Sequence, residues 1–253
     1  STSFDLRDRG LLLADGVFDT SLVRGGQVVL RAAHLDRLVE GATALGIALE
    51  RDAAAQVMDA TIEGVALGAL RITVTRGLAG EAVAAPTLIA NVYDYDASSH
   101  PSPVRAQESA ILRNPTSFTA RYKTLSYTDN IAALRAAMAA GFEEAFFFTA
   151  AGNLACASVA NVFVQSGEAI FTPPVSDGAL PGVMRNWLLE QGRIGERTVS
   201  ERSISREELN AADRVFLTNS LRLFQPVSAF GDKSFEAGLP EGCAGLRSQL
   251  IGS

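Results

Sequence analysis

The chain has 253 residues, of which 47% are hydrophobic, so it can bury a core as one large domain or as two smaller ones. The formal net charge of −6 argues against nucleic acid or an anionic membrane as a partner. No apolar stretch reaches the roughly 18 to 20 residues of a membrane span, and no signal peptide is visible. Two cysteines make no disulfide framework, and two histidines lack metal-ligand spacing. We therefore expect a cytoplasmic protein without a metal site.

The first half of the chain mixes strand and helix patterns. We predict, in chain order, strands over 16–23 and 27–31, helices over 34–45 and 51–63, and strands over 69–75 and 87–93. A hairpin loop at Arg24-Gly25-Gly26 joins the first two strands. The Ser and Pro content before residue 104 is typical of a linker. The expected division is an N-terminal domain over 1–97, a linker over 98–106 and a C-terminal domain over 107–253.

The second half continues the mixed pattern without a detectable repeat. An Ala-rich helix is predicted over 131–140, strands over 144–149, 161–165 and 214–218, and a helix over 183–191. Turn residues fill 150–153, and Ser205 with Glu208 three residues later has the spacing of a capping box. The last strand runs into a polar turn at 219–221.

Lys123 is a candidate for amine chemistry because Lys123 and Lys233 are the only lysines in the chain. Lys123 lies beside Tyr122 and close to Tyr127, just before the Ala-rich helix, where partial desolvation would favour the neutral, nucleophilic amine. Lys233 lies in Gly231-Asp232-Lys233-Ser234, which has the composition of an exposed turn. The alternative for Lys123 is a solvated surface charge.

Six motifs occur in an order that resembles the class IV aminotransferases, the group that contains branched-chain and D-amino-acid aminotransferases and aminodeoxychorismate lyases. They are Asp8 to Thr20, His34 to Leu38, Lys123 to Tyr127 with Asn130, Gly152 to Phe163, Leu180 to Val183 with Arg185, and Leu217 to Val227. The resemblance covers nearly the whole chain. It implies an α/β (α+β) enzyme of fold type IV, with a smaller N-terminal α/β domain and a larger C-terminal α/β domain that contains a barrel-like sheet.

The resemblance also implies pyridoxal phosphate as the cofactor, an amino donor and a keto acid as substrates, and a homodimer. Lys123 would form the Schiff base and move the substrate proton as general base and acid. The cofactor-binding residues that it implies are Arg37, Lys123, Tyr127, Cys156, Gly182, Val183, Met184, Asn219 and Ser220. Arg37, the start of the helix at 183 and Ser220 would meet the phosphate, and Tyr127 the ring hydroxyl. Without the resemblance, Arg37 would be interpreted as a solvated charge and Tyr127 as a core residue.

Cys156 departs from the family pattern. Counting back five residues from Asn161, the family has a glutamate that pairs with the pyridine nitrogen of the cofactor, and this chain has a thiol. A carboxylate keeps that nitrogen protonated and makes the ring a strong electron sink, which a neutral thiol cannot do as well. Compared with an aminotransferase, the substitution therefore favours a lyase. In a lyase a leaving group departs early and relieves the negative charge of the carbanion.

A second departure concerns the substrate. D-amino-acid aminotransferases carry a carboxylate-binding arginine a few residues beyond the Thr75-Arg76-Gly77 position, where this chain has Glu81. Phe18 stands where that subgroup often has tyrosine. Arg121 and Arg222 are candidate anchors for a substrate carboxylate, and each could instead be a surface or structural charge.

Three hypotheses follow. The first is a pyridoxal-phosphate-dependent aminotransferase that acts on an amino acid or amine through Lys123. The second is a lyase of the aminodeoxychorismate type that releases pyruvate, favoured by the segments 219–221 and 225–227. The third is a protein that binds pyridoxal phosphate with weak or no turnover because Cys156 replaces the usual glutamate.

Overall fold

The structure is a computed structural model that describes residues 4–78, 85–95 and 102–252. The chain forms two compact units: a first unit of Ser1–Ala97 with Tyr122–Tyr127, and a second unit of Ser98–Arg121 with Thr128–Ser253. Part of the predicted linker, 98–101, lies outside the described residues, and a strand begins at Val104 within its remainder. The domain boundaries proposed from sequence stay a prediction.

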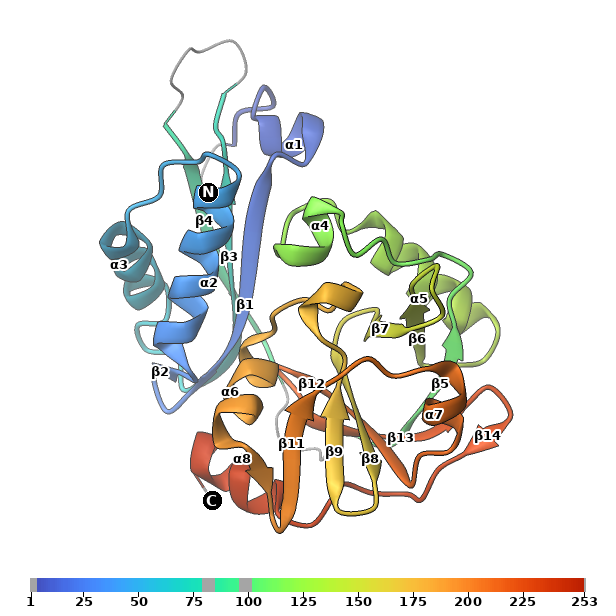
Figure 1. The fold of residues 1–253 in the computed structure, drawn as a ribbon. Coiled ribbons are helices and arrows are strands. Elements are labelled where there is room, and N and C mark those ends of the chain that lie inside the picture. Colours follow the sequence, from blue (N-terminus) through green and yellow to red (C-terminus); the bar gives the residue numbers. More distant parts are fainter. Residues whose placement is uncertain (1–3, 79–84, 96–101, 253) are drawn as a thin grey trace. The chain divides into compact units, whose positions relative to one another are not determined.

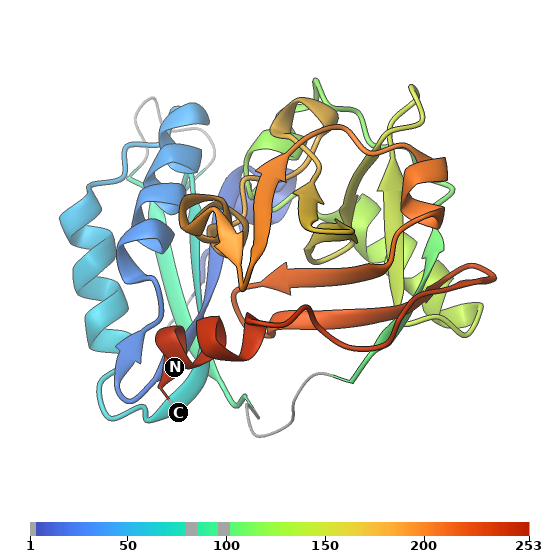
Figure 2. The same cartoon turned by 60° about the horizontal axis from the view of Figure 1, so that its bottom comes forward.

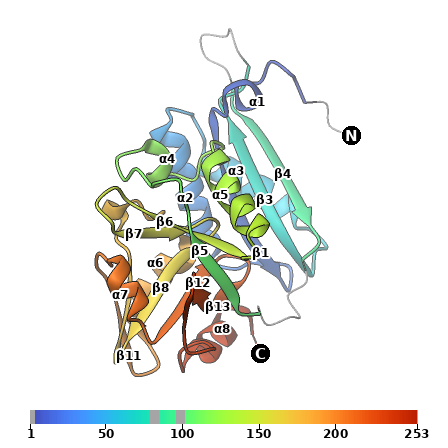
Figure 3. The ribbon, with the colours of Figure 1, turned by 90° about the vertical axis from the view of Figure 1, so that its right-hand side faces the viewer.

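The first unit contains an antiparallel sheet with the strand order β2-β1-β3-β4. Its strands are β1 (Gly16–Arg24), β2 (Gln27–Val28), β3 (Leu67–Thr75) and β4 (Thr87–Tyr93), and Figure 3 shows β3 and β4 side by side. The predicted hairpin is confirmed: Gly25 and Gly26 take φ values of 59° and 75°, which a tight two-residue turn requires. The strand predicted over 27–31 ends at Val28, because a helix begins at Arg31.

Three helices accompany this sheet: α1 (Arg9–Leu13), α2 (Arg31–Ala44) and α3 (Arg51–Thr61). Helices α2 and α3 cover one face of the sheet (Figure 1), as their shared apolar core requires. That core joins Leu35 and Leu38 of α2, Met58 of α3, and Val17 and Leu70 of the sheet, all nearly inaccessible to solvent. The apolar residues of α2 thus lie at helical spacing on its buried face.

The second unit contains a mixed ten-stranded sheet in the order β10-β11-β9-β8-β12-β13-β5-β6-β7, with β14 beside β13. The strands are β5 (Val104–Glu108), β6 (Glu144–Phe148), β7 (Leu154–Ala157), β8 (Asn161–Ser166), β9 (Ala169–Thr172), β10 (Arg193–Ile194), β11 (Arg197–Glu201), β12 (Arg214–Asn219), β13 (Leu223–Phe230) and β14 (Lys233–Ser234). They can be followed by colour in Figure 2, from green β5 through yellow β8 to red-orange β13.

The helices of this unit are α4 (Phe118–Arg121), α5 (Thr128–Ala139), α6 (Val183–Gln191), α7 (Arg206–Asn210) and α8 (Cys243–Ile251), with a 3-10 turn at Val175–Asp177. The bounds of α6 match the prediction, and Ser205 and Glu208 form the predicted capping box. Strand β13 was not predicted, because Gln225 and Pro226 interrupt its apolar pattern. It forms because it pairs with two other strands. It is antiparallel to β12, which directly precedes it, and parallel to β5, which is far away in the sequence.

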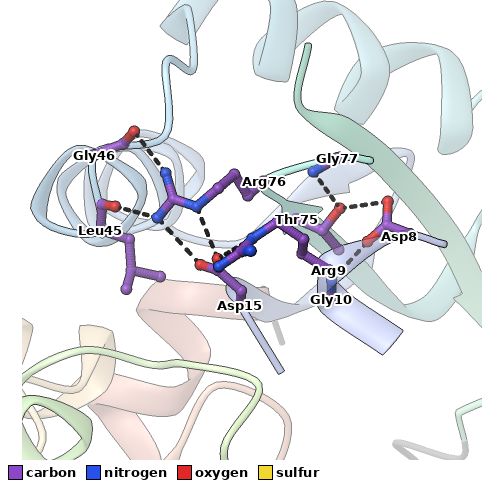
Figure 4. Close-up of polar contacts among 9 residues, drawn as sticks. All are labelled: Asp8, Arg9, Gly10, Asp15, Leu45, Gly46, Thr75, Arg76 and Gly77. Carbon is purple, nitrogen blue, oxygen red and sulfur yellow. Dashed lines mark hydrogen bonds and ion pairs between the residues drawn. The ribbon is translucent and has the colours of Figure 1, made fainter. Parts of the chain in front are cut away.

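A polar network ties α1 to the end of the first sheet (Figure 4). Asp8 is buried and accepts hydrogen bonds from Gly10 N at 2.7 Å, Thr75 Oγ1 at 2.8 Å and Thr87 Oγ1 at 2.7 Å. Asp8 therefore caps the helix and satisfies two strand hydroxyls at once.

Asp15 supplies the second part of this network (Figure 4). It accepts from Arg9 Nε at 2.8 Å and from Arg76 Nε at 2.7 Å. Arg76 also donates to the carbonyls of Leu45 at 2.6 Å and Gly46 at 3.1 Å, which end helix α2. One arginine thus links the end of α2 to the start of β1.

We predict that Asp8→Ala lowers the free energy of unfolding by roughly 1 to 3 kcal/mol, because it removes the cap and leaves buried donors without an acceptor. Urea unfolding of the apoprotein measures this. Asp5→Ala is the matched control, since Asp5 forms an exposed ion pair with Arg7 and its loss is expected to change the free energy of unfolding much less. Equal effects of the two substitutions would contradict the role assigned to Asp8.

Candidate functional site

The segment that carries Lys123 lies along β1 in the first unit. Phe18 N donates to Lys123 O at 3.0 Å, and Leu125 N donates to Gly16 O at 2.9 Å. Between these bonds, Val17 and Thr124 form an isolated antiparallel bridge. The Lys123 segment therefore behaves as a short additional strand whose register is set by backbone hydrogen bonds.

The amine of Lys123 lies against two aromatic rings of the first unit. Its Nζ is 4.2 Å from the ring centroid of Phe18 and 4.8 Å from that of Tyr127, and these rings pack edge to face at 5.4 Å. Burial lowers the pKa of Lys123 to about 7, and the nearby positive charge of Arg37 adds to this effect, while Asp19 opposes it. A substantial fraction of the amine is therefore neutral near neutral pH, as a nucleophile or general base requires.

Arg37 pairs with a buried carboxylate. Its Nε lies 2.8 Å from Asp19 Oδ2, and its Nη2 also lies 2.8 Å from that oxygen. The other oxygen, Asp19 Oδ1, is 2.6 Å from His34 Nδ1. Burial by itself would raise the pKa of Asp19, but the charges and hydrogen bonds of Arg37 and His34 outweigh it and lower the pKa to about 2. Asp19 is therefore ionised at physiological pH.

Arg71 of β3 belongs to the same group of side chains, and the sequence analysis missed it. Its guanidinium carbon lies 3.8 Å from the ring centroid of Phe18, and burial lowers the pKa of Arg71. The register of β1 and β3 pairs Phe18 with Thr73, so Arg71 is the diagonal neighbour on the same face of the sheet. The contact follows from the register of β1 and β3, and the sequence alone does not give that register.

Cys156 of β7 is buried in the second unit among apolar side chains. Its neighbours include Ala133 and Ala137 of α5 and Phe147 of β6. Burial raises the pKa of the Cys156 thiol, and the nearby Glu144 adds to this, while Arg113 opposes it. The thiol is therefore neutral.

Two polar side chains brace the turn that follows β7. Ser158 donates to Glu144 Oε1 through its backbone N at 3.0 Å and through its hydroxyl, and Asn130 Nδ2 donates to Ser158 O at 2.7 Å. Burial raises the pKa of Glu144, although these hydrogen bonds oppose the shift. Within the described part of the chain, Glu144 Oε2 is buried without a hydrogen-bond partner.

The start of helix α6 is shaped by Asn161. Gly182 is the N-cap residue and makes no side-chain cap, and a Cβ at this position would overlap Asn161 Oδ1. Asn161 Nδ2 and Gly182 N both donate to Leu180 O, at 2.9 and 2.7 Å. The first backbone N–H groups of α6, including those of Val183 and Met184, have no partner within the helix. They form a donor set for an anion.

The polar turn after β12 lies next to this region in the sheet. Asn219 Oδ1 accepts from Leu221 N at 3.1 Å and Arg222 N at 2.8 Å, which closes the turn around Ser220. Thr218 is the register partner of Asn161, so both side chains lie on the same face of the sheet. Thr218 Oγ1 is buried and, among the residues described, has no hydrogen-bond partner.

The remaining predicted substrate residues do not join a cluster within their unit. Arg121 is the exposed last residue of α4. Arg222 is partly buried and donates to Gln225 Oε1 at 2.7 Å. Glu81 lies outside the described residues. The first unit thus brings together Lys123, Phe18, Tyr127 and Arg37, and the second unit brings together the start of α6 and the Asn219–Ser220 turn.

Two kinds of feature are absent from the described residues. In that part of the chain, no group of three or more His, Cys, Asp or Glu side chains could hold a metal ion. Likewise, none of the helices described there is both long and apolar enough to cross a membrane.

The family model for amino-transferase class IV matches residues 16–230. The D-alanine aminotransferase of Bacillus licheniformis is 25% identical over 254 residues, which cover 93% of this chain and 86% of that protein. The structure of 4-amino-4-deoxychorismate lyase from Pseudomonas aeruginosa superposes with a TM-score of 0.87 at 28% identity, covering 99% of this chain and 95% of that one. The PLP-bound form of a hypothetical aminotransferase from Mycobacterium tuberculosis gives a TM-score of 0.85 at 25% identity, covering 99% and 92%.

These matches agree with the ordered motifs and with the mixed α/β architecture of the two units. The family model alone spans most of the chain, including Lys123 and the turns at 182 and 220. The chain belongs to the class IV aminotransferase family of fold-type IV enzymes, which comprises pyridoxal-phosphate-dependent aminotransferases and lyases.

Proposed function

We propose that this enzyme is an aminotransferase that binds pyridoxal phosphate and moves an amino group from an amino acid or amine to a keto acid. Lys123 is the residue that bonds to the cofactor and transfers the substrate proton. The observation that carries this proposal is the amine itself, which lies against Phe18 and Tyr127 with its pKa lowered to about 7. A catalytic base works best when its pKa is near the operating pH.

Each unit, taken by itself, offers groups of the kind that bind a phosphate. In the first unit, the Arg37 guanidinium is planar and partly buried, which suits a bidentate contact with phosphate oxygens. In the second unit, Gly182, Val183 and Met184 begin helix α6, and Asn219 and Ser220 form the adjoining turn. The buried Thr218 hydroxyl supports this assignment, because a phosphate oxygen would supply the partner that it lacks among the described residues.

The ring of the cofactor is assigned to Tyr127 and Cys156. When bound, pyridoxal phosphate supplies an electron-withdrawing ring that stabilises negative charge on the substrate carbon. Tyr127 donates to the ring hydroxyl, and Lys123 accepts and returns the proton at that carbon. Cys156 lies among apolar side chains, and burial keeps its thiol neutral. A neutral thiol offers no negative charge to the ring nitrogen, so its contact with that nitrogen would be weak.

The neutral Cys156 thiol also favours the second candidate, a lyase of the aminodeoxychorismate type. A less protonated ring withdraws fewer electrons, so a reaction with an early leaving group is less affected than transamination. Aminotransferase remains the main proposal, and the two reactions differ in their products.

A substrate carboxylate needs a positive partner near Lys123. Arg71 is the preferred candidate, because its guanidinium stacks on Phe18, the same ring that Lys123 contacts. Phe18 then forms an apolar wall of the substrate site. Arg121 and Arg222 stay as the candidates proposed from sequence, although Arg121 is exposed and Arg222 is engaged with Gln225.

The active form is proposed to be a homodimer in the cytoplasm. Helix α1 supports self-association, because Leu11, Leu12 and Leu13 expose 56%, 57% and 61% of their surface and no residue of the helix is buried. Exposed apolar residues at consecutive positions are typical of an interaction surface. The polar network of Figure 4 would hold this helix in place for a partner.

We predict that borohydride reduction in the presence of pyridoxal phosphate attaches the cofactor to Lys123. Mass spectrometry of the digested protein should find the adduct on the peptide containing Lys123 in the wild type and in Lys233→Ala. No adduct is expected in Lys123→Ala. Lys233 is the matched control because it is the only other lysine. An adduct of equal yield in Lys123→Ala would contradict the proposal.

We predict that Lys123 makes folding more favourable as pH rises. The folded protein releases the Lys123 proton near pH 7, whereas the unfolded chain keeps it until about 10.5, so the unfolded state binds more protons in this window. The free energy of unfolding of the apoprotein, relative to Lys123→Met, should therefore increase with pH between about 7 and 10.5. Urea titrations at several pH values measure it, and a constant difference would count against a lowered pKa.

We predict that amino donors yield more than one equivalent of product per enzyme only when a keto acid acceptor is present to take up the amino group. A screen of donors and acceptors with isotopically labelled nitrogen should follow the label into the acceptor. Release of pyruvate from aminodeoxychorismate without an acceptor would instead establish the lyase. If cofactor binds and neither product forms, the protein binds pyridoxal phosphate with little turnover.

A further inference from the structure

Three ionisable side chains form a buried relay in the first unit. Asp19 of β1 bonds to His34 through one oxygen, at 2.6 Å, and to Arg37 through the other, at 2.8 Å. The exposed fractions of their side chains are 3% for Asp19, 2% for His34 and 13% for Arg37. Buried charges of this kind cost solvation energy and are rare unless they are paired.

The relay lies beside the apolar core of the first unit. His34 and Arg37 are three residues apart on α2, so they lie on the same face of the helix. The adjacent residues Leu35 and Leu38 belong to the apolar core that also contains Val17 of β1. Hydrophobic residues of similar volume would fill such positions at equal or lower cost, so stability alone does not explain the relay.

Asp19 uses only one edge of the Arg37 guanidinium. Its oxygen Oδ2 accepts from Nε at 2.8 Å and forms an ion pair with Nη2, which also lies 2.8 Å away. A guanidinium has five N–H donors in one plane, so the edge formed by Nη1 and the second hydrogen of Nη2 can still bind two oxygens. Pinning one edge fixes the plane and direction of the other.

The charge of the surrounding group favours an anion. Arg37 and Arg71 both act electrostatically on Lys123, and Asp19 is the carboxylate that acts on both Lys123 and Arg71. Asp19 is ionised, yet one carboxylate does not balance two arginines. Asp19 thus orients Arg37 without neutralising the group.

We propose that Asp19 and His34 are positioning residues that hold the Arg37 guanidinium for the phosphate of the cofactor. This inference rests on the proposed function, in which Arg37 binds that phosphate. His34 donates its Nδ1 hydrogen to Asp19 and stops the carboxylate from rotating, and Asp19 in turn stops the guanidinium from rotating. Neither residue touches the cofactor. A preset guanidinium loses little entropy on binding and gives a bidentate contact its full strength.

The test compares two ligands that differ only in the phosphate. Apoprotein is titrated with pyridoxal phosphate and with pyridoxal. The dissociation constant of pyridoxal divided by that of pyridoxal phosphate measures how much the phosphate contributes to binding. Asp19→Asn and His34→Leu should each reduce this ratio by roughly tenfold, the loss expected for one charge-assisted hydrogen bond. A residue with only a structural role would weaken both ligands alike and leave the ratio unchanged.

Matched variants control for general damage. His34→Asn keeps a side-chain N–H donor near the position of Nδ1, so its ratio should stay close to that of the wild type. Asp15→Asn breaks another carboxylate–arginine contact of the first unit, with Arg9 and Arg76, and should leave the ratio unchanged. If Asp19→Asn does not fold, the pair His34→Leu and His34→Asn still decides the question.

The results separate this inference from the proposed function. A lower ratio in Asp19→Asn and His34→Leu, with His34→Asn near the wild type, supports the relay. If the ratio is lower in Arg37→Ala but unchanged in Asp19→Asn and His34→Leu, the relay is overturned, whereas the proposed contact between Arg37 and the phosphate is supported. An unchanged ratio in Arg37→Ala overturns both the phosphate contact and the relay.

Discussion

The first unit depends on the pairing of the Lys123 segment with β1. Backbone hydrogen bonds from Phe18 to Lys123 and from Leu125 to Gly16 fix the register of this short strand. Because side chains alternate along β1, neighbouring residues serve opposite faces: Phe18 meets the lysine amine and Asp19 meets helix α2. A shift of one residue would exchange these faces, so the chemistry of Lys123 depends on backbone geometry as much as on its own side chain.

The electrostatics of this unit follow from burial. Removing Lys123 from water disfavours its charged form, and two arginines nearby increase the effect. Asp19 opposes it, because a buried carboxylate that bonds to Arg37 and His34 stays ionised. The balance leaves an amine that can exchange a proton near neutral pH while the arginines remain available for anions. The same carboxylate therefore serves both the orientation of Arg37 and the proton affinity of Lys123.

The second unit supplies rigid turns. Asn130, Asn161 and Asn219 each bond to a backbone carbonyl of a neighbouring turn, at Ser158, Leu180 and Val159. These bonds link the end of β7, the start of α6 and the end of β12 into one connected structure. Small amides suit this role because they satisfy backbone groups without adding charge.

The sequence by itself determined the family, the α/β class, half of the described strands, the longer helices α2, α3, α5 and α6, and the candidate lysine, because ordered motifs and local periodicity are written along the chain. It did not predict the strands β5, β7, β9, β10, β11, β13 and β14 or the helices α1, α4 and α8, many of which are short or are interrupted by polar residues or proline. Only the tertiary structure decided that Asp19 and His34 stand behind Arg37, that Arg71 stacks on Phe18, and that Cys156 lies among alanines. These contacts join segments far apart in the chain, and the register and packing that create them leave no local signal.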